Sequence, residues 1–286
     1  MRRRETGDRA GRRAKPGTWA AGVALLTALV IIAMTPAAHG AAKLAVRLAA
    51  AMNSIPRKAS APAPAGMPTG VPFHGTPAVG ALFSTTSSGG LGNHFCTASV
   101  VRSPHRDLAI TAAHCVTHHN RAIQFVPGYS GGDEPYGVWT ISKVIVDRAW
   151  SASGSIDDDV AFLLVEPARD GGSIQDVTGA EGIAFERPTS LPVQVIGYPD
   201  GHDLPLICHN RTSMPLPHQL EFDCGQYTDG TSGGPFLITA RPGDADGTVI
   251  GVIGGYQQGG DLPQISYSPA FGPNVAALYR TAVSQG

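Results

Sequence analysis

Charged side chains are scarce in this sequence of 286 residues, making up 15% of it against 42% hydrophobic residues. This balance excludes a wholly disordered chain and leaves enough apolar residues for a core. Aromatic residues are also few, at 7%, and cysteine occurs only four times. Glycine (36) and proline (23) are abundant instead, which favours a loop-rich β protein over a helical bundle.

Basic residues become rare beyond residue 70, where 10 Arg and Lys stand against 20 Asp and Glu, a formal charge of −10. An acidic main region argues against nucleic acid as a partner. Nothing in the sequence demands a cofactor.

The N-terminus has the opposite character, with seven Arg and Lys within residues 1–15 followed by an apolar run over about 19–38. We predict a signal peptide at 1–40, cleaved near Gly40, and a secreted protein. An uncleaved membrane anchor is the alternative, because the run approaches the about 20 residues that a span needs. Only in that case would the membrane be a partner.

Residues 41–75 read as a pro-segment or linker. Within it, 43–52 could form a short amphipathic helix, and 59–70, rich in Ala, Pro and Gly, should not pack.

From residue 76 onward, short β-type runs recur between Gly, Pro and Asp residues, which indicates a sandwich or barrel. Only 274–283 has a helical apolar pattern. The expected strands are 79–84, 95–102, 108–111, 138–146, 160–165, 193–197, 235–238 and 249–253.

Ser232 lies in the segment Gly-Thr-Ser-Gly-Gly-Pro at 230–235. Glycines beside a serine permit a tight turn and leave backbone N–H groups free to meet an oxyanion, as a nucleophile needs. An ordinary Gly/Ser turn is the simpler alternative. The segment also fits Gly-x-Ser-x-Gly of α/β-hydrolases. Their histidine follows the serine, however, whereas all ten histidines here precede Ser232, which argues against an esterase or other acyl transferase.

His114, in Thr-Ala-Ala-His-Cys at 111–115, is the candidate base. Its neighbour Cys115 could fix the loop through a disulfide, with Cys96 as the obvious upstream partner, worth about 3 kcal/mol for a loop of this length. A metal cluster of His114 with His118 and His119 is the alternative, but no Cys or carboxylate set completes it. We therefore predict no metal.

Asp159 is the best-placed acid of the run Asp157–Asp159, because it adjoins the apolar stretch 160–164. An acid must hold the catalytic histidine in its productive tautomer. The other two acids would cap the loop or stay solvated, and a calcium loop is disfavoured by their spacing.

Taken in order, Thr-Ala-Ala-His-Cys, Asp-Val-Ala-Phe-Leu and Gly-Thr-Ser-Gly-Gly-Pro resemble the signature segments of trypsin-like serine peptidases. Pro127-Gly128-Tyr129, Tyr136-Gly137-Val138-Trp139 and Gly197-Tyr198-Pro199 are more similar to the secreted bacterial, glutamyl-endopeptidase-like branch. The resemblance spans 76–286. It implies an all-β fold of two six-stranded antiparallel barrels, at about 76–185 and 186–286, with a short C-terminal helix.

The resemblance also implies a serine endopeptidase that acts on protein or peptide substrates, with a monomer as the default. His114, Asp159 and Ser232 would form the triad, and the N–H groups of Gly230 and Ser232 the oxyanion hole. A catalytically silent homologue that binds protein partners through the same fold is the competing hypothesis.

The sequence departs from the family at several positions. Thr231 replaces the Asp that receives the new N-terminus in trypsins, and Gly254 replaces a Ser that supports the catalytic Asp, so one support for Asp159 would be missing. Gln226, at the expected pocket base, carries no charge. Ile253 is uncharged as well, and it occupies the position where glutamyl members carry His. We therefore expect an uncharged residue before the cut, with a substrate pocket formed by Gln226, Gly254, Gly255 and Tyr256. The strand at 254–256 could instead be an ordinary core strand.

Four cysteines in an exported protein suggest two disulfides, with three possible connectivities. Cys208 and Cys224 remain after Cys96 and Cys115, and a bond between them would stiffen the pocket wall. Asn210-Arg211-Thr212 matches a glycosylation acceptor, to which we give little weight.

Overall fold

Each of the eight runs expected to form strands overlaps a strand of the structure, which also has strands that were not expected, such as those at 123–127 and 206–211. The computed structural model describes residues 64–117, 122–169, 171–239 and 246–286. The predicted signal peptide, the possible helix at 43–52 and the rest of 1–63 lie outside the described residues. Among those described, no helix has the length and apolar character needed to cross a bilayer. The elements in chain order are β1 (Val71–Pro72), β2 (Val79–Thr85), β3 (Leu91–Val100), β4 (Leu108–Thr111), α2 (Ala113–Val116), β5 (Ile123–Pro127), β6 (Trp139–Val146), α3 (Arg148–Ser153), η1 (Ile156–Asp158), β7 (Ala161–Val165), α4 (Ile174–Thr178), β8 (Gly182–Ile183), β9 (Pro192–Gly197), β10 (Leu206–Arg211), β11 (Ser213–Leu216), β12 (Gln219–Asp223), β13 (Pro235–Thr239), β14 (Gly247–Val252), η2 (Tyr256–Gly259), β15 (Ile265–Pro269) and α5 (Pro273–Val283).

The first half of the fold is a closed six-stranded barrel in the order β2-β3-β4-β7-β6-β5. All of its strand pairs are antiparallel. Strand β7 (Ala-Phe-Leu-Leu-Val) is buried along its whole length, because β4 and β6 flank it and the barrel interior covers it. A continuous apolar run is the expected sequence for a strand covered on both faces.

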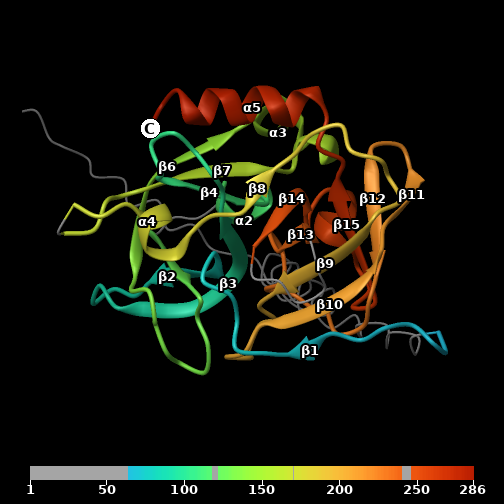
Figure 1. Cartoon of the computed structure of the whole chain (residues 1–286), viewed down its shortest axis with the longest axis horizontal. Coiled ribbons are helices and arrows are strands. Elements are labelled where there is room, and N and C mark those ends of the chain that lie inside the picture. Colours follow the sequence, from blue (N-terminus) through green and yellow to red (C-terminus); the bar gives the residue numbers. More distant parts are fainter. Residues whose placement is uncertain (1–63, 118–121, 170, 240–245) are drawn as a thin grey trace, which may run out of the picture. The chain divides into compact units, whose positions relative to one another are not determined.

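The second half consists of two sheets, in the orders β1-β10-β9-β13-β14-β8 and β11-β12-β15 (Figure 1). Side chains bridge the seams between them. The Ser268 hydroxyl accepts a hydrogen bond from Val252 N at 2.9 Å, and Asn210 Nδ2 donates to Asp223 O at 2.7 Å. Among the described residues, the two sheets therefore meet through side-chain bonds, with no ladder between β14 and β15.

The end of the predicted linker packs, contrary to our expectation for 59–70. Gly70 N donates to Gly225 O, and Gly225 N donates to Pro68 O, both at 2.9 Å. Strand β1 then pairs with β10, beside which it runs in Figure 1. The backbone of this Ala-, Pro- and Gly-rich stretch is satisfied by hydrogen bonds to neighbouring strands and loops, which its composition does not reveal.

The predicted C-terminal helix is confirmed as α5, which begins with Pro273 at its first turn, a position that suits proline. Its buried face consists of Val275, Leu278 and Ala282, and Tyr279 packs on Phe162 of β7 with ring centroids 5.6 Å apart. The helix therefore caps the first barrel (Figure 1).

Candidate active site

His114 and Asp159 are brought together by the pairing of β4 with β7. Thr111 at the end of β4 lies opposite Ala161 at the start of β7, so the residues just beyond these ends meet. Asp159 Oδ2 lies 2.7 Å from His114 Nδ1, and Asp159 Oδ1 accepts a hydrogen bond from His114 N at 2.8 Å. The Asp159 side chain is fully buried, whereas 12% of the His114 side chain is exposed. The histidine is therefore held at two points by a desolvated carboxylate.

Gly254 has no hydroxyl that could support Asp159, and the backbone of the next residue provides this support instead. Gly255 N donates to Asp159 Oδ2 at 2.8 Å. With His114, this gives the carboxylate three N–H contacts. The expected gap in its support is therefore filled without a serine hydroxyl.

Gln219, at the start of β12, connects the two segments that flank Asp159. Its fully buried side chain accepts a hydrogen bond from Tyr256 N at 2.9 Å and donates to Asp157 Oδ1 at 2.7 Å. Asp158 in turn accepts from Ser155 and from Asn274 at the start of α5, so Asp157 and Asp158 hold the loop. No sequence pattern marks Gln219 or Asn274, because both act through contacts distant in the chain.

Ser232 lies in a turn that only glycines can form. Gly230 has φ of +90°, and a Cβ there would lie 2.6 Å from both Asp200 N and Tyr198 O. Gly233 has φ of +80°, and its missing Cβ would overlap Thr111 Oγ1 and Thr97 O. The turn is thus pressed against the β4 end that leads to His114.

The turn and the histidine loop are both attached to β3 at consecutive residues. Thr97 N donates to Ser232 O at 2.7 Å, and Cys96 forms a disulfide with Cys115, the neighbour of His114. Among the described residues, the structure has no hydrogen bond between the Ser232 hydroxyl and His114. In the same part of the chain, the N–H groups of Gly230 and Ser232 donate to no protein acceptor, which leaves both available to a ligand oxygen.

A carboxyl group borders this turn. A Cβ added at Gly230 would lie 2.7 Å from Asp200 Oδ1. The backbone of Asp200 also contacts the segment before the turn, since Asp200 N donates to Asp229 O at 2.7 Å. Burial raises the pKa of Asp200, and the nearby Asp229 raises it further, while His94 lowers it. The exposed Asp200 side chain therefore lies directly beside the backbone of Gly230.

The second disulfide joins Cys208 and Cys224. In the first, Cys96 and Cys115 lie with His114 so that their potential ligand atoms are within 4.8 Å of one another. This group is not a metal site, because both sulfurs are bonded to each other and neither is a thiolate. His118 and His119, the other members of the alternative metal cluster, lie outside the described residues.

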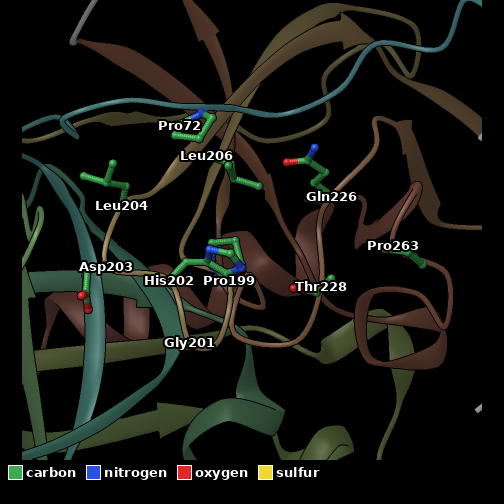
Figure 2. Close-up of a pocket in the computed structure, with 10 residues that line it drawn as sticks. All are labelled: Pro72, Pro199, Gly201, His202, Asp203, Leu204, Leu206, Gln226, Thr228 and Pro263. Atoms are coloured by element: carbon green, nitrogen blue, oxygen red, sulfur yellow. The ribbon is translucent and has the colours of Figure 1, made fainter.

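Of the four residues expected to form the substrate pocket, Gln226 lines the described pocket shown in Figure 2, and the other three are not among the residues that line it. Gln226, with φ of +76°, faces Leu204 across a pocket of about 640 Å³ that Thr228 and Pro263 also line (Figure 2). Gly254 and Gly255 lie beside Asp159 instead, and Tyr256 packs edge-on against Tyr267 with centroids 5.2 Å apart. Tyr227, between Gln226 and Thr228, is buried and donates from its hydroxyl to Val195 O at 2.6 Å.

The trypsin family model matches residues 71–266, which is more than half of the chain and includes every residue of the candidate triad. The chain belongs to the trypsin family. It is therefore a serine-type endopeptidase, and its substrates are proteins or peptides. A comparison with curated proteins found no match.

Three of the solved structures similar to this trypsin-family protein are proteases. Protease Anisep from Arthrobacter nicotinovorans has 23% identity and a TM-score of 0.65, covering 76% of this chain and 100% of its own. The thermostable serine protease AL20 from an extremophilic microorganism has 26% identity and a TM-score of 0.63, covering 74% and 99%. A Glu endopeptidase has 15% identity and a TM-score of 0.59, covering 77% and 99%. These matches share the fold with this trypsin-family chain over nearly their whole length.

Proposed function

We propose that this protein cleaves peptide bonds through a catalytic triad of His114, Asp159 and Ser232. The observation that carries the proposal is the two-point contact between Asp159 and His114, at 2.7 and 2.8 Å. This contact fixes the imidazole so that Nδ1 carries the proton and Nε2 can accept one. The attachment of the Ser232 turn and the His114 loop to neighbouring residues of β3 supports the same assignment.

The reaction follows from these roles. Ser232 Oγ attacks the peptide carbonyl carbon while His114 Nε2 takes its proton. The oxyanion that forms accepts hydrogen bonds from Gly230 N and Ser232 N, each worth roughly 3–4 kcal/mol in such sites. The C–N bond then breaks as His114 returns the proton to the leaving amine. Water, deprotonated by His114, hydrolyses the acyl-enzyme and frees Ser232.

We also propose that the protein acts outside the cytoplasm. Both disulfides are formed in the structure, and such bonds persist in oxidising compartments. The basic and apolar N-terminus agrees with export.

We further propose that the residue before the cut is uncharged. Gln226 carries no charge, and Ile253 is buried with 3% exposure, so neither position offers an ionic partner. A positional peptide library tests this. We expect cleavage after uncharged residues, and strict preference for Glu, Lys or Arg would refute the specificity proposal alone.

The mechanism is tested by labelling the purified full chain and any processed form with a fluorophosphonate probe, with casein degradation followed in parallel. We expect labelling and casein loss in the wild type, and neither in Ser232→Ala. Ser151→Ala is the matched control, because Ser151 is an exposed helix residue whose hydroxyl donates only to Asp147 O.

Labelling that persists in Ser232→Ala would assign the nucleophile elsewhere. A folded wild type that is neither labelled nor active would overturn the proposed mechanism and favour the binding-module hypothesis.

A further inference from the structure

Thr97 of β3 is a fully buried threonine located where the first barrel meets the Ser232 turn. Its backbone N donates to Ser232 O at 2.7 Å. Its hydroxyl donates to Gly230 O at 3.2 Å and accepts a hydrogen bond from Tyr198 N at 2.9 Å. One residue of the first barrel therefore holds both residues whose N–H groups are the proposed oxyanion donors.

The turn is tied to the end of β14 on its far side, where Gly233 N donates to Ile253 O at 2.8 Å, but Gly230 has few anchors of its own. Gly230 has no side chain and lies at φ of +90°, where glycine rotates readily. The hydroxyl of Thr231 donates to Thr228 O at 2.7 Å within the same loop, so it does not tie the turn to another element. Thr231 thus offers no substitute for a charged anchor before the nucleophile.

The Thr97 hydroxyl contacts the peptide plane between the two proposed donors. Gly230 O belongs to the peptide that joins Gly230 to Thr231, so a bond to this oxygen restricts rotation between the N–H groups of Gly230 and Ser232. The second bond, from Tyr198 N, fixes the hydroxyl itself, because its oxygen accepts there and its hydrogen is directed to Gly230 O. The Thr97 carbonyl accepts from Thr111 Oγ1 at 2.7 Å, which fixes Thr97 on β4.

We propose that the Thr97 hydroxyl is a positioning residue for the oxyanion hole, holding Gly230 so that its N–H and that of Ser232 converge on one oxygen. This role rests on the proposed function of those two N–H groups. Thr97 touches no reacting atom and acts only through Gly230.

The test compares Thr97→Val, which keeps the shape and the backbone N–H but removes the hydroxyl, with Thr97→Ser, which keeps the hydroxyl. Thr212→Val is the matched control. The Thr212 hydroxyl is also buried, accepts from Leu191 N at 3.0 Å and donates to Thr189 O at 2.8 Å, but it lies at the β10–β11 junction, outside the Ser232 turn.

Kinetic constants are measured per active site, counted by fluorophosphonate titration. We expect kcat of Thr97→Val to fall about 10- to 100-fold, somewhat less than the loss of a whole oxyanion donor, with KM nearly unchanged. The affinity for a peptide boronic acid, whose tetrahedral adduct places an oxygen in the hole, should fall by the same factor as kcat/KM. Thr97→Ser and Thr212→Val should keep both values near those of the wild type.

The outcomes separate this role from its alternatives. If Thr97→Val loses thermal stability like Thr212→Val but keeps its kcat and boronate affinity, the hydroxyl is only structural and the proposal is overturned. Should Thr97→Val fail to fold, Thr97→Ala is assayed in the same way, and wild-type kinetics there would overturn the proposal equally. A wild type that the fluorophosphonate does not label would refute the proposed function itself, whereas a labelled wild type with an unaffected Thr97→Val refutes only this role.

Discussion

Both carboxylate oxygens of Asp159 contact N–H groups, and this makes the site sensitive to the replacement of either oxygen. Oδ1 accepts from His114 N, while Oδ2 faces His114 Nδ1 and accepts from Gly255 N. In Asp159→Asn, an NH₂ group replaces one of the two oxygens. In place of Oδ1 it would face the backbone N–H of His114, and in place of Oδ2 it would face both His114 Nδ1 and Gly255 N. The histidine must then take the wrong tautomer or turn away. We expect kcat to fall by about 10⁴-fold, measured with a chromogenic peptide.

Asp157→Asn is the control for that change, because its amide oxygen can still accept the bond from Gln219 Nε2. It should retain most of the activity, and equal losses in the two variants would contradict the role of Asp159.

The sequence predicts which of the three acids adjoins the buried strand, since the apolar run begins at residue 160. It does not predict the Gly255 N–H contact, because that contact depends on where β14 ends in space.

At the scale of elements, β12 supports the site through Gln219. This side chain bonds to Tyr256 N on one side and to Asp157 and Ile156 O on the other. Gln219→Leu has a similar volume but leaves buried backbone groups unpaired, at about 1–3 kcal/mol each. We expect a lower free energy of unfolding, measured in urea, together with a lower kcat because the segment that carries Gly255 N loosens.

Gln175→Leu provides the comparison. Gln175 in α4 accepts from Ser103 N at 3.1 Å, so its loss should lower stability and leave kcat unchanged. A Gln219→Leu variant that loses stability but keeps full kcat would show that β12 supports the fold and not the site.

Elements differ in how far their sequences predict them. β7 and β14 are apolar and bounded by glycine or acidic residues, so their patterns predict them. β10 and β11 contain Asn, His, Arg and Pro, and their pairing depends on distant partners and on the Cys208–Cys224 bond. The same dependence explains why the sequence does not predict the residues that surround Gln226: they come from β1 and the loop before β10, neither of which has a distinctive motif.

At the scale of the whole molecule, Glu181 joins the two halves of the fold. Its backbone bonds to Val100 O and Arg102 N at the end of β3, and its carboxyl accepts a hydrogen bond from Gly247 N of β14. The side chain is fully buried, and Oε1 has no hydrogen-bond partner among the described residues. Burial, against the opposing effect of the Gly247 bond and with a smaller contribution from Asp246, raises the pKa of Glu181 from 4.5 to about 7.

This raised pKa predicts how the stability of the molecule depends on pH. Because the folded state holds the proton more tightly than the unfolded chain, stability should fall as pH rises from about 4.5 to about 7 and then level off. The full effect is roughly 3 kcal/mol. Glu181→Gln should remove this slope and be more stable than the wild type at pH 8. Melting temperatures between pH 4.5 and 8 test this in a Ser232→Ala background, which prevents self-digestion. Exposed Glu166→Gln should keep the wild-type slope, and a slope that survives in Glu181→Gln would assign the proton to another buried group.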